Sequence, residues 1–430
     1  MAHKTYKWLT ILTGILGTIG VASVIYRLIA GMKITWLSSS VPWGMWVALY
    51  IYFIGLSAGS FLFSTLIYVF GQKELEKAGR LALLSAVLAL VAGLFFVWID
   101  LGHPFRIINI AFHWNSSSVL AWEILFYVFY ITCVFAELWF LMRCDLAYMR
   151  DQSHGFKKKV YKLLALGWQC PTTIGSFRAC HSQSLRVTAI LGAIGVPLAI
   201  GVHGGTGAIF AVVKARPYWY SPIFPIIFLV SALVSGAGLM TFLYAFLGDK
   251  KAPDHHRIVL KLSQWLMLFL GVDVLLMITE LLVGIYGSIP DHIAVWNQIM
   301  FGEYWYVFWI GQMGLTVLTP ILFFVLKKGS TFWMGMGGLA VATGIISVRF
   351  NLVIPAFVTP PIPHLDEVMN HIRLSFEYFP SPMEWISSIG IIALVVFFFL
   401  QAYKFLPVFE HYKPHLMQGT IQAKEVNYEA

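Results

Sequence analysis

The chain of 430 residues is 59% hydrophobic and 11% charged, with a formal net charge of +9. An ordinary soluble domain has about 25% charged residues, so this chain has too little polar surface to cover a water-soluble globule. Composition therefore excludes a soluble enzyme and predicts an all-α polytopic membrane protein. The four cysteines form no C-x-x-C pair, so neither a zinc site nor an iron–sulfur cluster is expected in this chain, and no metal site is predicted.

Hydrophobic segments predict ten transmembrane helices, because a bilayer core about 30 Å thick takes roughly 20 apolar residues per helix. The first segment follows Lys4 and Lys7 without a cleavage site, so it is expected to be a retained helix. Proline and glycine mark the gaps in "SSSVPWG", "GHP", "ARPYWYSP" and "TPPIPH". The predicted helices are 8–30, 43–70, 79–101, 117–142, 187–213, 221–247, 259–287, 304–326, 331–350 and 386–406.

The distribution of basic residues predicts an orientation in the cytoplasmic membrane. Lysine and arginine concentrate at the two termini and in the even-numbered gaps between the predicted helices. By the positive-inside rule both termini are cytoplasmic, and the net charge reports topology and not binding to nucleic acid. The basic segment 143–186 is expected to be a solvated connection that faces lipid headgroups. The opposite, outer face receives "DLGHPFR" and the loop 351–385.

Two predicted helices resemble each other, "WVALYIYFIGLSAGSFLFSTLIYVFG" and "PIIFLVSALVSGAGLMTFLYAFLG". Small residues at their centres would let helix backbones approach closely. Both run in the same direction, which favours a parallel duplication, although chance similarity between apolar segments is the alternative. We therefore expect two four-helix bundles, helices 2–5 and 6–9, flanked by helices 1 and 10. The expected domains are 1–42 (helix 1 and an outer loop), 43–213 (first bundle), 214–350 (second bundle), 351–385 (outer loop) and 386–430 (helix 10 and a cytoplasmic tail).

Ionisable side chains inside the predicted helices are candidates for function, because they are costly in a bilayer. They are Asp100, Glu123, Glu137, His203, Asp273 and Glu280, with Arg27 and Arg349 at outer helix ends. His203 is the single histidine deep inside a predicted helix, whereas a b-type haem in a bundle usually takes two. No haem is therefore expected. The alternative for His203 is a buried side chain bonded to a neighbouring carbonyl.

Spacing suggests roles for the carboxylates. Asp273 and Glu280 are seven residues apart, which is nearly two helical turns and places them on one stripe. This pattern favours a proton or cation route that also includes Glu137, with purely structural carboxylates as the alternative. Asp100 ends its helix in "FFVWIDLGHPFRIINI", where the helix dipole opposes a negative charge. Either this is a simple helix stop, or the carboxylate is held by Arg106 or another cation.

Several motifs together resemble the NrfD/PsrC family of quinone-interacting membrane subunits. "DLGHPFR" resembles the family's D-L-G-R-P-x-R signature, with His103 in the usual place of an arginine. "PLAIGVHGGTGAIF", "RPYWYSPIFPIIFLVSALVSG", "SVRFNLVIPAF" and "YFPSPMEWISSIG" resemble the ten-helix branch that includes HybB, ActC and DsrP. Within that branch the chain is most similar to DsrP or to the membrane subunit of an archaeal Hdr-like menaquinol oxidoreductase.

The resemblance implies a quinol-oxidising or quinone-reducing subunit that works only within a membrane complex. Its substrate would be a quinone, with menaquinone favoured, bound at the outer face of the first bundle. His203 would bond the quinone, with Asp100 and Glu123 exchanging protons. Trp43, Tyr50, His103, Arg106, Trp219 and Arg349 would line the quinone pocket. An extracytoplasmic ferredoxin-type iron–sulfur subunit, a cytochrome and a heterodisulfide-reductase-like subunit would be partners, in dissimilatory sulfur metabolism such as sulfite reduction.

Two other classes of function fit the residues. Asp273 and Glu280 could couple cation movement in a secondary transporter, although transporters often have inverted repeats and the repeat here is parallel. The protein could also be a structural anchor for redox partners. Quinol-dependent reduction by the purified complex separates the first hypothesis from these two.

Overall fold

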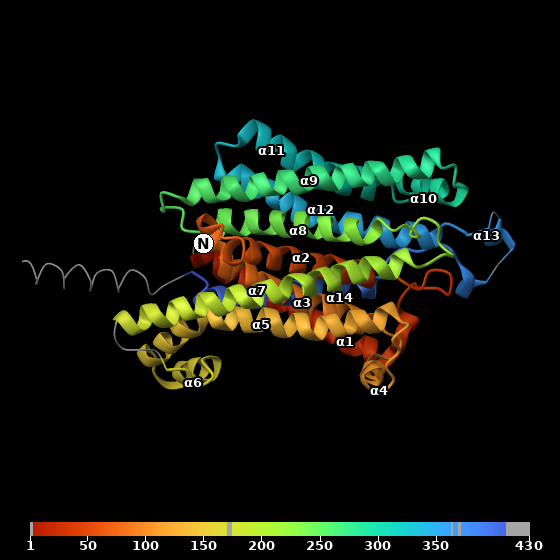
Figure 1. Ribbon diagram of the computed structural model, residues 1–430. Helices are drawn as coiled ribbons and strands as arrows, with labels where there is room; N and C mark the ends of the chain where they lie inside the picture. Colours follow the sequence, from red (N-terminus) through yellow and green to blue (C-terminus); the bar gives the residue numbers. More distant parts are fainter. Residues whose placement is uncertain (1–2, 170–173, 363, 369–370, 410–430) are drawn as a thin grey trace, which may run out of the picture.

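The computed structural model describes residues 3–169, 174–362, 364–368 and 371–409, and within them every regular element is a helix (Figure 1). Ten helical segments are long and apolar enough to cross a membrane, which confirms the predicted fold class. The long helices are α1 His3–Ala30, α2 Met45–Tyr68, α3 Glu76–Asp100, α5 Val119–Gln152, α7 Ile174–Ala211, α8 Phe224–Leu247, α9 His255–Tyr286, the pair η4 Val307–Leu318 and α11 Thr319–Lys327, α12 Thr331–Val358 and α14 Pro382–Phe405. The shorter helices are η1 Gly31–Ile34, η2 Lys73–Leu75, η3 Pro104–Ile108, α4 Asn109–Phe112, α6 Gly155–Leu164, α10 Pro290–Phe301, α13 Leu365–Val368 and η5 Ile372–Leu374.

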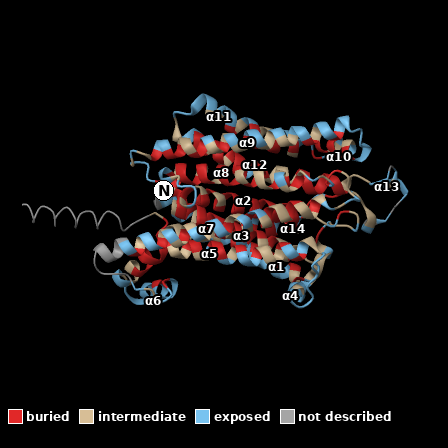
Figure 2. Ribbon diagram, viewed as in Figure 1, coloured by how far each residue is buried: buried red, intermediate tan, exposed pale blue. Residues whose placement is uncertain are grey.

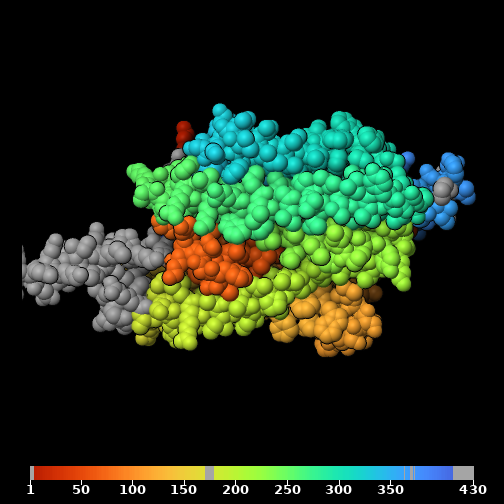
Figure 3. Space-filling view, turned by 45° about the horizontal axis from the view of Figure 1, so that its top comes forward, coloured from red at the N-terminus to blue at the C-terminus, as the bar shows by residue number. Residues whose placement is uncertain are grey.

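The long helices pack in two layers that meet at α2 and α8. Helix α2 contacts α3, α7 and α8, while α5 contacts α7 and α3. Helix α8 contacts α9 and α12, and α12 contacts η4 and α11. Helices α1 and α14 pair with each other and lie against α3. In Figure 3 the green-to-cyan segments from α8 to α11 form one layer above the yellow-green segment of α7.

The centre of the molecule is tightly packed where α2 crosses α8. A Cβ atom on Gly59 would collide with the carbonyl oxygen of Ala232, and one on Gly236 would collide with the backbone of Gly59. Nearly all of α2 is buried, whereas the outward faces of α5 and α9 are exposed (Figure 2). Small residues therefore allow the two backbones to approach closely, as the sequence predicts.

Three predicted helix boundaries were wrong, the end of α5, the start of α7 and the end of α12. Helix α5 continues beyond residue 142 to Gln152, and the charge of Asp145 in this added stretch is buried in an ion pair with Arg80 at 2.6 Å. Helix α12 continues beyond residue 350 through Pro355 to Val358. Arg349, expected at a helix end, therefore lies inside α12 and is 1% exposed. The segment 143–186, expected to be a loop, contains the end of α5, α6 and the start of α7.

The two ends of the molecule carry different connections. We call the end with α4, α10 and α13 the α4 face, and the end with α6 the α6 face (Figure 1). Tyr378 ties the connections of the α4 face together, since its hydroxyl donates to Glu384 at 2.5 Å and accepts from the backbone of Met45 at 2.8 Å. Burial raises the pKa of Tyr378, so the hydroxyl keeps the proton that it donates.

Candidate quinone site

A cavity of about 420 Å³ opens at the α4 face between α3 and α5. Its size lies within the usual range of small-molecule sites, roughly 300–1,000 Å³. Most of its wall is aliphatic, from Leu94, Val97, Leu101, Ile107, Ile110, Leu120, Ile124, Val128 and Ile131. Leu120 and Val128 are also exposed on the outer surface of α5, where a bilayer would lie. A lipid-soluble ring with an apolar tail therefore fits the shape and chemistry of this cavity.

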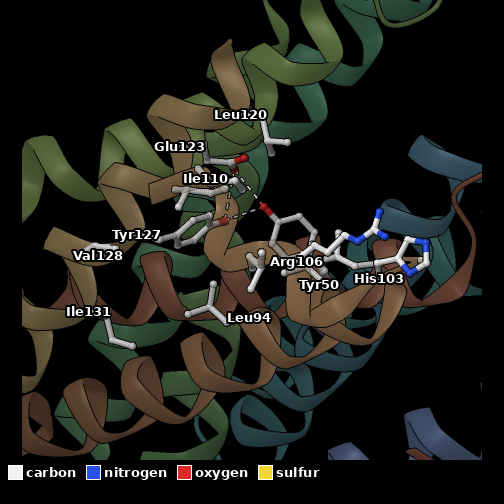
Figure 4. Close-up of a pocket in the computed structure, with 15 residues that line it drawn as sticks. Tyr50, Leu94, His103, Arg106, Ile110, Leu120, Glu123, Tyr127, Val128 and Ile131 are labelled. Carbon is white, nitrogen blue, oxygen red and sulfur yellow. Dashed lines mark hydrogen bonds between the residues drawn. The ribbon is translucent and has the colours of Figure 1, made fainter. Parts of the chain in front are cut away.

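One carboxylate, Glu123 of α5, supplies the buried acid of the cavity. Its Oε1 accepts hydrogen bonds from Tyr50 at 3.0 Å, from Tyr127 at 3.3 Å and from Thr206. The hydroxyl oxygens of Tyr50 and Tyr127 also lie 2.8 Å apart, and since each hydroxyl has one proton, one of them shares its proton between this contact and Glu123. Figure 4 shows these oxygen atoms turned toward one another. Helices α2, α5 and α7 thus hold the carboxylate in one orientation.

The second carboxylate oxygen, Glu123 Oε2, is buried and has no hydrogen-bond partner among the described residues. A buried unpaired carboxylate oxygen is costly, so such groups usually bind water, an ion or a ligand. A ligand hydroxyl in the cavity could donate to this oxygen. The arrangement is suited to accepting a proton from a bound molecule.

His103 and Arg106 of the "DLGHPFR" motif line the other end of the cavity, as Figure 4 shows. They belong to the short segment that starts at Gly102 and continues as η3, which Pro104 initiates. Both side chains can donate hydrogen bonds to a carbonyl oxygen. The cavity therefore has proton acceptors at one end and donors at the other.

Asp100 lies outside the lining of this cavity. The charged groups that act on it are Glu384 of α14 and Arg27 of α1. Arg27 also donates to the carbonyl oxygen of Leu101 at 2.5 Å. Arg27 is thus a cation beside Asp100, where the sequence suggested Arg106 or another cation.

His203 also lies outside the cavity lining, at the contact between the two layers. It is fully buried, and neither ring nitrogen has a hydrogen-bond partner among the described residues. A Cβ atom on Gly55 would lie 3.5 Å from His203 Nε2 and 3.4 Å from Arg349 Nη2, so both side chains use the space left by this glycine. Arg349 donates to Ser231 at 2.9 Å. His203 thus shares its space with Arg349 and is not part of the cavity lining, although Thr206, one turn later on α7, bonds Glu123.

The two predicted tryptophans form a separate aromatic cluster. Trp43 and Trp219 stack with ring centroids 6.2 Å apart, and both contact Phe210 and Phe357. Trp219 donates to the carbonyl oxygen of Leu352 at 2.8 Å. Neither tryptophan lines the cavity.

The proposed proton-route carboxylates lie in two places. Glu137 of α5 is buried and accepts from Ser64 at 2.8 Å. Asp273 and Glu280 line a smaller cavity of about 80 Å³ in the second layer, together with Arg349. Spacing on one helix thus correctly placed Asp273 and Glu280 on a shared surface.

Two polar residues of the site were missed in the sequence. Tyr127 stands four residues after Glu123, so the helical repeat could have indicated that they share a face. Thr206 had no such signal, because its partner lies on a different helix.

A family profile described as "Polysulphide reductase, NrfD" matches residues 33–361. The chain belongs to the NrfD family. This NrfD-family protein is 46% identical to a selenate reductase subunit of Mesobacillus selenatarsenatis, over 92% of each sequence. It is 26% identical to the "Hdr-like menaquinol oxidoreductase integral membrane subunit" of Archaeoglobus fulgidus, over 87% of its own length and 86% of that protein. It is also 26% identical to one of the polysulfide reductase chains of Wolinella succinogenes, over 73% of its own length and 94% of that protein.

Membership confirms the family that the sequence motifs suggested. The relatives just named are subunits or chains of oxidoreductases, so this member of the NrfD family is a membrane subunit of a redox complex of this type. The archaeal relative is one that the motifs had pointed to, but the selenate reductase subunit is considerably more similar.

Proposed function

We propose that the protein binds menaquinol in the cavity beside Glu123, oxidises it, and passes the electrons to an iron–sulfur partner subunit. The cavity supports this proposal by its size, its aliphatic walls and its opening on the outer surface of α5. The observation that carries it is the unpaired, buried oxygen of Glu123 at the wall of that cavity. The name of the archaeal relative, which contains menaquinol, supports the same substrate class.

In this mechanism Glu123 is the first proton acceptor. One quinol hydroxyl donates to Glu123 Oε2 while Tyr50, Tyr127 and Thr206 hold Oε1 in place. The other quinol oxygen lies toward His103 and Arg106. Oxidation removes two electrons and two protons from the quinol. One proton goes to Glu123, which then releases it toward the α4 face, and the other passes from the second quinol oxygen to the exposed imidazole of His103 and on to water. A general base of this kind contributes about 10²–10⁴-fold to a rate.

The electrons go to the cluster of a ferredoxin-type iron–sulfur subunit docked on the α4 face. The positive-inside rule supports an extracytoplasmic α4 face and cytoplasmic termini in the cytoplasmic membrane. A cytochrome and a heterodisulfide-reductase-like subunit are the further partners that the sequence motifs suggested. This chain itself would hold no haem and no cluster.

The relative with the highest identity of those named favours an oxyanion such as selenate as the final electron acceptor. A sulfur compound is the second candidate, supported by the polysulfide reductase relative at 26% identity. The cation-coupled transporter has less support, because the small cavity at Asp273 and Glu280 also contains the buried cation Arg349.

The test is quinol oxidation by the purified complex, with an artificial electron acceptor in place of the terminal reductase. Wild-type complex should oxidise menaquinol, and a variant with Val128→Trp, which fills the cavity, should lose at least about tenfold in kcat/KM. Equal rates in the two proteins would contradict a quinol site in this cavity. Val91→Trp is the matched control, because Val91 is exposed on α3 outside the cavity lining.

A further inference from the structure

The second cavity, of about 80 Å³, is a polar chamber inside the second layer. Its polar lining consists of Tyr218, Asp273, Glu280, Gln312, Arg349 and Asn351. Asn351 Nδ2 donates to Gln312 Oε1 at 2.8 Å, but Asn351 Oδ1 and Arg349 Nε have no partner among the described residues. Each water takes roughly 30 Å³ of liquid volume, so the chamber has room for water beside polar atoms that need partners.

Glu280 connects this chamber to His292, a residue that the sequence analysis did not single out. Both side chains are buried, and His292 Nε2 lies 3.1 Å from Glu280 Oε1. Gly284, one turn after Glu280 on α9, makes the contact possible, because a Cβ atom there would overlap the imidazole ring. The other ring nitrogen, Nδ1, has no partner among the described residues.

A third, shallow cavity of about 20 Å³ lies next to Asp291, the residue that precedes His292. It is lined by Arg216, Tyr218 and Asp291, among others, so Tyr218 forms part of the wall of both this cavity and the chamber. The ring of His292 lies 5.4 Å from that of Tyr218. His292 is thus bonded to Glu280 of the chamber and follows Asp291 in the chain, and Asp291 is exposed and lines the third cavity.

We propose that Glu280 and His292 form a proton exit from the chamber to the α4 face. This inference rests on the proposed function, because quinol oxidation in the first layer would drive the proton movement. The carboxyl proton of Glu280 passes to Nε2 of His292. Nδ1 lies against Gly284 of α9, so the imidazole must rotate before it releases a proton to water beside Asp291. Rotation or tautomer exchange of the imidazole restores the starting state. Both ring nitrogens are needed, which is the property that distinguishes histidine from glutamine.

The chamber also has a route for protons from deeper in the second layer. Asp273 lies on the same helix two turns before Glu280, and the charge of Arg349 acts on Asp273. The same Arg349 is adjacent to His203, at the boundary with the layer that contains the quinol cavity. The polar groups thus extend from the centre of the molecule to the α4 face.

The experiment measures how many protons the complex in sealed liposomes releases on the α4 side for each quinol that it oxidises. The two-electron oxidation of a quinol by itself releases both of its protons. The wild-type complex should release more than these two protons per quinol on the α4 side. His292→Gln and Glu280→Gln should each lower the number to the two protons of the quinol itself. Quinol oxidation, measured with a protonophore present, should stay within about twofold of wild type. His256→Gln, at the opposite end of α9, should keep the wild-type ratio.

The possible failures are distinct. The proton exit would be overturned if both variants released as many protons per quinol as the wild type. It would also be overturned if the wild type released only the two protons of the quinol, and in both cases quinol oxidation would still stand. Absence of quinol oxidation in wild type would instead contradict the proposed function. In that case the proton exit is tested without quinol, by following the exchange of the Glu280 carboxyl proton with external D₂O in infrared spectra. His292→Gln should slow this exchange at least about tenfold, and an unchanged rate would refute the exit.

Discussion

The hydroxyl of Tyr50 donates a hydrogen bond of 3.0 Å to Oε1 of Glu123 and so joins α2 to α5 at the wall of the cavity. Tyr127 and Thr206 donate to the same oxygen. Because all three donors converge on Oε1, the other carboxylate oxygen is left for a ligand. This asymmetry makes Glu123 the residue whose substitution should be most informative.

Replacing Glu123 with glutamine should lower kcat for quinol oxidation by at least about 10²-fold, because an amide cannot accept the proton. The melting temperature should change little, since an amide oxygen can still accept from Tyr50 and Thr206. Steady-state kinetics and thermal unfolding of the purified complex measure the two quantities. Glu303→Gln, an exposed carboxylate on the same face, is the control. A Glu123→Gln variant with wild-type kcat would remove Glu123 from the chemistry.

His203→Ala should leave KM for quinol within about threefold of wild type, because the imidazole is not part of the cavity lining. The sequence alone led to the opposite expectation, a direct hydrogen bond from His203 to the quinone. The rate of quinol oxidation by the variant complex, measured at a series of quinol concentrations, gives KM and distinguishes the two expectations. A tenfold rise in KM would return His203 to the site.

Hydrophobic length was sufficient to predict ten helices, since the bilayer sets how many apolar residues each must contain. It could not predict that α5 continues to Gln152, because the pairing of Asp145 with Arg80 comes from a helix far away in the sequence. The site shows the same limit. Tyr50, His103, Arg106 and Glu123 were predicted and line one cavity, whereas Trp219 and Arg349 face other helices. Motifs identify unusual residues, but helix rotation decides which of them meet.

Arg80→Ala should lower the free energy of unfolding by about 3–5 kcal/mol, because it leaves the buried carboxylate of Asp145 without its partner. Arg80 also donates to the carbonyl oxygen of Pro407 at 2.9 Å, so the end of α14 should loosen. Denaturant unfolding in detergent measures the change.

Lys77→Ala is the matched control for Arg80. Lys77 pairs with Asp254 at 2.5 Å, but the two side chains are 56% and 38% exposed, and the bond holds the pKa of Asp254 below its usual range. Water screens such a pair, so its loss should change stability by less than about 1 kcal/mol. If Lys77→Ala and Arg80→Ala lowered the free energy of unfolding equally, burial would not be what makes the Arg80–Asp145 pair important for stability.

Gly59→Ala should destabilise the contact between the two layers by about 1–3 kcal/mol, because its methyl group would meet the carbonyl of Ala232. Gly204→Ala is the control, since a methyl group there meets nothing within 4 Å. Thermal unfolding of the two variants in the same detergent compares them directly. Equal stability would show that the crossing of α2 and α8 tolerates a wider separation.

The most direct test of the account is the position of a photoreactive menaquinone analogue cross-linked to the purified complex. Peptide mass spectrometry should find the label on residues 94–110 and 120–131, which contain most of the lining of the large cavity. Unlabelled menaquinone and the Val128→Trp substitution should each abolish most of this labelling. Labelling confined to α8, α9 or α12, or labelling of residues 94–131 that Val128→Trp leaves unchanged, would contradict a quinol site beside Glu123.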